Sequence, residues 1–350
     1  MDLRRLGRTD VAVSKICLGT MTFGEQNTEA EGHAQLDRAF AAGVNFLDAA
    51  ELYPIPPRPE TQGRTERIIG TWLKARGLRD KVVVATKVVG RSEMTHFRKD
   101  GSEGRLTAAQ INEAVDRSLI NLQTDYIDLY QVHWPDRNVS GFGSNPNRWA
   151  DPEPLTDETP IEETLEALTA LVKAGKVRHL GLSNESPWGT MSYLKAAELR
   201  GLERVVSIQN AYNLVNRTFE SGLAEVALRE QVGLLVYSAL GQGYLTGKYR
   251  NGALPGGSRK ALFNRLQRYE KPGAEVAINA YVDLARDAGL DPSQMAIAFA
   301  LSRSFVTSVI IGATSLAQLE TALGAADLRL PADVLSRIDD LHQLHGNPCP

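Results

Sequence analysis

Four residues that can donate, accept or stabilise protons follow apolar, strand-like stretches of this 350-residue chain. Asp48 ends Asn-Phe-Leu-Asp, and Tyr53 follows five residues later on the emerging loop. Lys87 ends Val-Val-Val-Ala-Thr-Lys, and His133 ends Asp-Leu-Tyr-Gln-Val-His. Taken singly, each has an ordinary structural interpretation: a turn or cap, a packing aromatic, a solvated end charge and a core histidine. Their shared position after consecutive strands favours one common site.

Such a set of side chains is suited to protonating an oxyanion as it forms. A tyrosine has an ordinary pKa of about 10 and is a weak acid–base group at neutral pH. A nearby ammonium lowers that pKa because it stabilises the phenolate. A carboxylate keeps the lysine charged, and a histidine beside the phenol can donate a hydrogen bond to a substrate oxygen. Carbonyl reduction requires this kind of proton delivery.

The elements that must position these residues are strands alternating with helices. Amphipathic helical patterns separate the strand-like stretches, and Asp291-Pro292 is typical of an N-cap followed by a first helical residue. The alternation predicts a single (β/α)8 TIM barrel over residues 1–350, with an extra C-terminal helix at 331–344, rather than an open doubly wound sheet. The predicted strands are residues 13–20, 44–50, 82–88, 126–133, 177–183, 206–212, 233–240 and 308–313.

Three predicted connections are too long to be simple turns: residues 89–105, 134–159 and 241–272. All of them follow strands, so they belong at the C-terminal face of the barrel, where barrel enzymes hold their active sites. They are rich in Gly, Pro, Asn and charged residues. We expect them to form the walls of a pocket, with Trp134 and Trp149 as possible lining or packing residues.

Composition narrows the classes of function. The chain is 43% hydrophobic with a formal net charge of −3, and no basic run reaches five residues, so neither nucleic acid nor a membrane surface is expected as a partner. Two cysteines and no apolar leader or membrane span indicate a reducing, cytoplasmic protein. His342, His345 and Cys349 near the chain end are too few for a convincing metal site, so no metal is predicted.

The chain resembles the aldo-keto reductase superfamily from residue 3 to about residue 325. The segment 53–66 is similar to the bacterial Tas-type branch, and the later cofactor segment is similar to the potassium-channel β-subunits. The motifs that carry the resemblance are LGTMTFG (18–24), FLDAAELY (46–53), TK (86–87), YIDLYQVHW (126–134), GLSN (181–184), QNAYN (209–213), GYLTGKY (243–249) and IIGAT (310–314).

The resemblance implies NADPH-dependent reduction of a small aldehyde or ketone. Tyr53 would be the proton donor, Lys87 would tune it and Asp48 would hold the lysine, while His133 would orient the carbonyl. The nicotinamide would lie on the ring of Tyr237. The cofactor contacts that the resemblance implies are Thr20, Met21, Asp48, Ser183, Asn184, Gln209, Tyr237, Ser238, Leu240, Gln242, Gly243, Leu245, Lys248, Arg259, Gly312, Thr314 and Gln318.

Within this NADP(H) site, Lys248 and Arg259 would meet the 2′-phosphate. The channel subunits carry a Glu-Asn pair that contacts adenine, and here Thr321 and Ala322 stand in those places, which leaves the adenine contact open. No G-x-G-x-x-G motif links a strand to a helix, so a Rossmann domain is not expected. A second interpretation is an NADP(H)-binding regulatory protein whose output is a partner surface. The oligomeric state is open at this stage.

Overall fold

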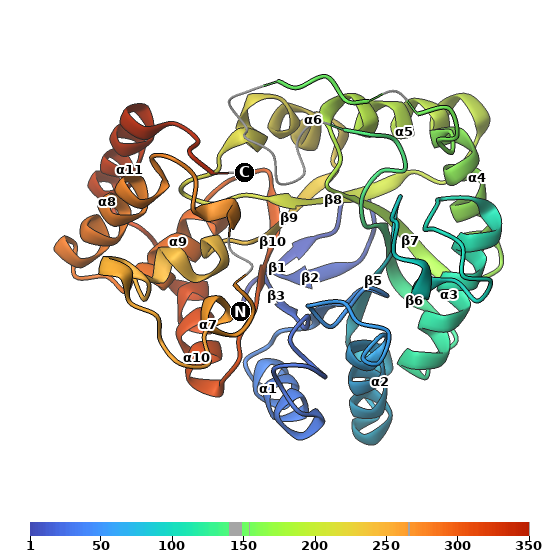
Figure 1. Ribbon diagram of the computed structural model, residues 1–350, viewed down its shortest axis with the longest axis horizontal. Helices are drawn as coiled ribbons and strands as arrows, with labels where there is room; N and C mark the ends of the chain where they lie inside the picture. The colour runs from blue at the N-terminus through green and yellow to red at the C-terminus, as the bar shows by residue number, and fades with distance from the viewer. Residues whose placement is uncertain (140–148, 154, 265–266, 350) are drawn as a thin grey trace.

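A closed barrel of eight parallel strands lies at the centre of the molecule, with helices around it (Figure 1). The computed structural model describes residues 1–139, 149–153, 155–264 and 267–349. This arrangement confirms the predicted (β/α)8 fold. Around the barrel, the strands are β10 (Val306–Ile311), β3 (Ile16–Gly19), β4 (Phe46–Asp48), β5 (Val83–Val88), β6 (Ile127–Val132), β7 (Val177–Ser183), β8 (Val205–Ala211) and β9 (Gly233–Tyr237).

A short antiparallel hairpin precedes the barrel, which corrects the predicted strand at 13–20. That stretch contains two strands: β2 (Ala12–Ser14), which pairs with β1 (Leu3–Arg5), and β3, which enters the barrel after Lys15. The apolar run continues through both strands because Val13 of the hairpin and Cys17 of the barrel belong to one buried cluster. The hairpin therefore contributes to the core inside the barrel.

Helices cover the outside of the barrel between successive strands. Thr28 and Glu31 form a capping box at the start of the first of them, and Asp291 caps α9 as predicted, accepting hydrogen bonds from the amides of Ser293 and Gln294. The barrel helices are α1 (Glu29–Ala41), α2 (Arg64–Arg76), α3 (Ala108–Leu122), α4 (Ile161–Lys173), α5 (Pro187–Arg200), α6 (Leu223–Glu230), α9 (Pro292–Leu301) and α10 (Leu316–Gly324).

Two further helices pack beside the barrel. α8 (Ala274–Asp287) and α11 (Ala332–His345) contact each other at the left edge of Figure 1, and α8 also contacts α9. α11 is the extra C-terminal helix that the sequence predicts at 331–344. A short helix, α7 (Arg259–Phe263), lies within the long connection after β9. Within the described chain, no helix is both long and apolar enough to cross a membrane.

The inside of the barrel has an apolar layer and, at the C-terminal ends of the strands, a polar layer. Because successive side chains of a strand point to opposite faces, residues two positions apart face the same way. The buried apolar layer includes Phe46, Ala85, Leu129 and Leu235. The residues two positions further along the same strands, at their C-terminal ends, are Asp48, Lys87, Gln131 and Tyr237. The strand alternation therefore brings these polar side chains together on the C-terminal side of the apolar layer.

Candidate functional site

A cavity of about 1160 Å³ lies at the C-terminal end of the barrel. Two of the predicted site residues do not line it: Lys87 is buried behind Asp48, and Leu245 packs in the hydrophobic core. Thr321 and Ala322, which replace the expected adenine contacts, line it as well. The predicted residues that line it are Thr20, Met21, Asp48, Tyr53, His133, Ser183, Asn184, Gln209, Tyr237, Ser238, Leu240, Gln242, Gly243, Lys248, Arg259, Gly312, Thr314 and Gln318.

A buried ion pair lies beside Tyr53 at the edge of the cavity. The ammonium of Lys87, which is 0% exposed, donates to Asp48 Oδ2 at 2.7 Å and to the carbonyl oxygen of Ala49 at 2.7 Å. Asp48 Oδ1 accepts a hydrogen bond of 2.8 Å from Gln209 Nε2. Burial lowers the pKa of Lys87, but Asp48 and Tyr53 together raise it above the ordinary value. The lysine therefore carries a fixed positive charge.

Tyr53 lies next to this charge. Lys87 Nζ is 4.9 Å from the centroid of its ring, and the ring of His133 meets it edge-on with centroids 5.8 Å apart. Burial raises the pKa of Tyr53, and the charge of Lys87 lowers it, with a smaller lowering effect from Arg259. The net pKa of Tyr53 lies above the ordinary value. The sequence argument correctly expects Lys87 to lower this pKa, but it leaves out the larger, opposite effect of burial. The phenol stays protonated at neutral pH.

His133 is also uncharged at neutral pH, for the same physical reason. Burial lowers its pKa well below the ordinary value, and the charge of Lys87 lowers it further. Its backbone carbonyl accepts a hydrogen bond of 2.9 Å from Asn184 Nδ2, whereas the buried Nδ1 has no hydrogen-bond partner among the described residues. A neutral imidazole has one N–H with which to donate a hydrogen bond.

The cavity also offers a flat ring beside amide groups. The Tyr237 hydroxyl donates to Asn184 Oδ1 at 2.5 Å, and Asn184 Nδ2 donates to Ser183 Oγ at 3.1 Å. Ser183 Oγ donates to the carbonyl oxygen of Gln209 at 2.8 Å, and the Gln209 side chain contacts Asp48. A planar aromatic carboxamide such as nicotinamide fits this combination of a ring platform and hydrogen-bonding amides.

After Tyr237, the chain makes tight turns suited to close approach by an anion. Ser238, Gly241, Gln242 and Gly243 all have positive φ angles. An added Cβ at Gly243 would lie only 2.9 Å from Lys248 Cε, so the turn brings backbone and basic side chain together. Successive turns that expose backbone N–H groups, with a lysine beside them, are a typical phosphate environment. The residues present therefore fit a phosphorylated dinucleotide.

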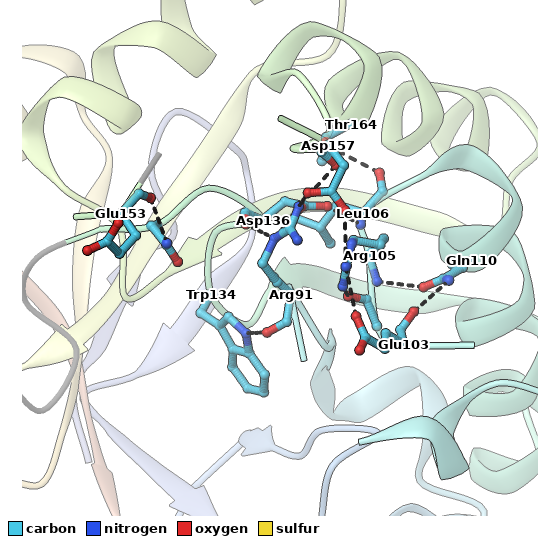
Figure 2. Close-up of polar contacts among 12 residues, drawn as sticks. Arg91, Glu103, Arg105, Leu106, Gln110, Trp134, Asp136, Glu153, Asp157 and Thr164 are labelled. Carbon is cyan, nitrogen blue, oxygen red and sulfur yellow. Dashed lines mark hydrogen bonds and ion pairs between the residues drawn. The ribbon is translucent and has the colours of Figure 1, made fainter. Parts of the chain in front are cut away.

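Trp134 borders the cavity and is held by a polar network that joins two long connections (Figure 2). The indole Nε1 of Trp134, which lines the cavity, donates to the carbonyl oxygen of Arg91 at 2.7 Å. Arg91 pairs with Asp136 at 2.9 Å and with Asp157 at 3.0 Å. Asp136 Oδ2 also accepts from the amide of Leu106 at 2.8 Å. This network joins the connection after β5 to the connection after β6.

A second buried ion pair fixes the loop that carries Tyr53. The carboxylate of Glu51 accepts from the amide of Val89 at 2.6 Å and pairs with Arg98 at 3.0 Å. Glu51 and Arg98 are both almost fully buried. Since Val89 follows β5 directly, this pair links the ends of the strands that carry Asp48 and Lys87 to the connection that follows β5.

Several residues at the site are not predicted by the sequence argument. Gln131 is inside the barrel, where it accepts a hydrogen bond of 3.2 Å from Gln209 Nε2, and its two-residue spacing from Leu129 and His133 is the signal that identifies it. Other unpredicted residues line the cavity from loops without periodicity, so no pattern marks them. They include Leu52, Ile55, Met94, Arg268 and Lys271. Trp149 is 71% exposed and donates to Asp151, away from the lining residues.

Among the residues that the structure describes, no group of three or more His, Cys, Asp or Glu side chains could hold a metal ion. Cys349 is fully buried, in the hydrophobic core. The polar groups at the cavity are instead the ion pair, the phenols, the imidazole and the amides already described.

The family comparison agrees with this geometry. Residues 15–343 match the model of the aldo/keto reductase family. The chain belongs to this family. Over 352 aligned residues, it is 49% identical to Protein tas of Escherichia coli (strain K12), which covers the whole of both chains. The chain therefore has the fold that its sequence resemblance implied.

More distant relatives of this chain differ in their printed descriptions. It is 29% identical over 339 residues to norsolorinic acid reductase stcV of Emericella nidulans, covering 94% of this chain and 78% of the relative. It is 30% identical over 351 residues to a probable voltage-gated potassium channel β-subunit of Oryza sativa, covering 98% and 97%. Named reductases and oxidoreductases among the relatives support an oxidoreductase.

Proposed function

We propose that this aldo/keto reductase reduces aldehydes or ketones to alcohols with NADPH, and that Tyr53 is the proton donor. The observation that carries the proposal is the buried Lys87–Asp48 pair directly beneath Tyr53, with uncharged His133 next to the phenol. Asp48, Tyr53 and His133 line the same cavity as the residues that fit a dinucleotide, and Lys87 lies directly behind Asp48.

Each residue has a defined task in this proposal. NADPH supplies the hydride when it is bound. Tyr53 holds its proton because its pKa is raised, and it releases that proton to the carbonyl oxygen as negative charge develops there. Lys87 stabilises the resulting phenolate, and Asp48 holds the lysine in place. His133 donates a hydrogen bond that orients the carbonyl.

Replacement of Tyr53 by Phe tests the chemistry. The change removes one hydroxyl and little volume, so NADPH affinity should change by less than about 1 kcal/mol. Reduction of a small aromatic aldehyde should slow by roughly 10²–10⁴-fold, the usual range for a lost general acid. The measurement is kcat beside cofactor affinity from fluorescence titration. Tyr126→Phe is the matched control, because Tyr126 precedes β6 at the other end of the barrel.

A double variant tests whether Tyr53 and Lys87 act as one unit. Lys87→Met alone should also reduce kcat, and the loss in the double variant should be less than the product of the two single losses, because both changes disable one proton transfer. Turnover near wild type in Tyr53→Phe would contradict the proposal and favour an NADP(H)-binding regulatory protein.

The choice of NADPH over NADH rests on Lys248 and Arg259. Hydrogen bonds to charged groups contribute about 1.5–3 kcal/mol each, so NADPH should bind roughly 10- to 1000-fold more tightly than NADH. Lys248→Gln should remove much of this difference by weakening NADPH binding alone. Equal affinities of the wild-type protein for the two dinucleotides would exclude the 2′-phosphate role of both basic residues.

A further inference from the structure

The cavity carries more positive charge than the 2′-phosphate requires. Its acidic lining residues, within the described chain, are Asp48, which is neutralised by Lys87, and Asp291, which caps α9. The basic side chains that line it are Lys248, Arg259, Arg268 and Lys271. The proposed function assigns Lys248 and Arg259 to the 2′-phosphate. The pyrophosphate of a dinucleotide then has only the backbone of the turns after Tyr237 to bind it.

Arg268 lies at the boundary between the ring platform and the tight turns. Burial raises the pKa of Tyr237, the last residue of β9, and the nearby guanidinium of Arg268 lowers it; both side chains line the cavity. The next residue, Ser238, begins the stretch of positive φ angles. The cations that act most strongly on the proton donor Tyr53 are instead Lys87 and Arg259. Arg268 therefore lies on the platform side of the cavity.

The residue after Arg268 anchors it to the barrel. Arg268 is in a 3₁₀ turn (Gln267–Tyr269), and Tyr269 is 2% exposed. The Tyr269 hydroxyl accepts a hydrogen bond of 2.9 Å from Asn213 Nδ2, which also donates to the carbonyl oxygen of Ser238 at 2.9 Å. The Tyr269 ring also lies against Gly241, where an added Cβ would be 3.2 Å from two ring carbons. The side-chain amide of Asn213 thus holds the segment that contains Arg268 next to the tight turns that begin at Ser238.

We propose that Arg268 binds the pyrophosphate of the dinucleotide, as a further cofactor-binding residue that rests on the proposed function. A guanidinium forms paired hydrogen bonds with phosphate oxygens, and its planar shape makes this geometry specific. The anchored turn places the guanidinium beside the turns that begin at Ser238, so cofactor binding does not have to order a free surface side chain. Arg268 acts on a group that NADPH and NADH share.

The test compares the affinities of both dinucleotides in Arg268→Gln, measured by fluorescence titration. NADPH and NADH should both bind roughly 10- to 100-fold more weakly, by the same factor, as expected for a lost charge-assisted hydrogen bond. Lys248→Gln should weaken NADPH alone. Arg250→Gln is the matched control, because Arg250 lies in the same connection but pairs with Asp283 and does not line the cavity. Arg268→Lys should recover part of the affinity.

The outcomes separate this role from others. Unchanged affinity for both dinucleotides in Arg268→Gln, with tight binding by the wild-type protein, would overturn the pyrophosphate role alone. A loss restricted to NADPH would also overturn it, because Arg268 would then bind the 2′-phosphate. Unchanged affinities with a raised KM for 4-carboxybenzaldehyde, but not for benzaldehyde, would assign Arg268 to a substrate carboxylate instead. Failure of the wild-type protein to bind either dinucleotide would overturn the proposed function together with this role.

Discussion

At the scale of single residues, burial keeps both aromatic acid–base groups of the site uncharged. It raises the pKa of Tyr53 and lowers the pKa of His133, since a poorly solvated environment disfavours the phenolate and the imidazolium alike. Lys87 remains the charged group because Asp48 compensates for its burial. This arrangement matches reduction, in which the phenol must start with its proton.

The pH dependence of reduction follows from these directions. In the proposed reaction the protonated phenol is the active form, and its pKa is raised, so activity should be present below that pKa and be lost as the pH rises through it. The rate of the chemical step should stay level from about pH 6 to 9 and fall only above about 10, the ordinary tyrosine pKa. Single-turnover reduction of an aldehyde across this range measures it.

Two features of the profile would contradict this interpretation. An inflection near pH 6.5, the ordinary histidine pKa, would mean that His133 titrates in the working enzyme. A decline that begins below pH 9 would mean that the lysine outweighs burial at Tyr53. His133→Asn, which retains a neutral hydrogen-bond donor, should lower the rate without changing the shape of the profile.

At the scale of elements, the connections after β5 and β6 act as one wall because charged side chains tie them together (Figure 2). Asp136 is 3% exposed and bonds both Arg91 and the amide of Leu106, whereas Asp157 contacts the same arginine from a largely exposed position. Exposed ion pairs contribute little, but loss of a buried hydrogen-bonded charge is costly. The wall therefore depends mainly on Asp136.

Substitution of the two aspartates separates their contributions to the wall. Asp136→Asn should raise the KM for aldehydes about tenfold, equivalent to about 1.4 kcal/mol, because Trp134 is held by the backbone of Arg91. NADPH affinity should be unchanged, since no side chain of this network is among the proposed cofactor contacts. Asp157→Asn is the control and should change KM less than about twofold. Equal effects of the two variants would show that burial does not set the strength of this network.

The sequence predicts the barrel and the place of Asp48, Lys87 and His133 at its C-terminal end because the strand pattern carries both, whereas Tyr53 lies on a loop after β4. The same two-residue spacing that places Phe46 inside the barrel places Asp48 there, and it also identifies Gln131 once the barrel is known. The hairpin at the N-terminus is not predicted, because its apolar residues continue the pattern of β3. Loop residues such as Arg268 have no periodic neighbours, and their position depends on tertiary anchors such as Tyr269.

At the scale of the whole molecule, the end of the chain supports the cofactor side of the cavity. The amide of Cys349 donates to the carbonyl oxygen of Val215 at 3.2 Å, and the amide of Val215 donates to Asn213 Oδ1 at 3.0 Å. Asn213 in turn holds Ser238 and Tyr269. A continuous set of contacts therefore runs from the C-terminal segment, past the end of β8, to the turns after β9.

Removal of residues 347–350 tests this support. The deletion exposes the site of buried Cys349 and removes the hydrogen bond of 2.6 Å from the Arg217 amide to Asn347 Oδ1. Loss of this packing and of two hydrogen bonds should lower the free energy of unfolding by about 2–4 kcal/mol. NADPH should bind several-fold more weakly, because Ser238 and Tyr269 lose their support. Urea unfolding and fluorescence titration measure the two effects.

Two point variants make the deletion interpretable. Cys349→Ala keeps the backbone hydrogen bond and removes only the buried thiol, so it should cost about 1 kcal/mol of stability and leave NADPH affinity near wild type. Leu344→Ala on α11 changes a residue that is 74% exposed and should alter neither quantity. If the deletion lowers stability but leaves NADPH affinity at the wild-type value, the C-terminal segment stabilises the fold without positioning the cofactor turns. The hydrogen bonds that connect Val215 to Ser238 would then have no effect on cofactor binding.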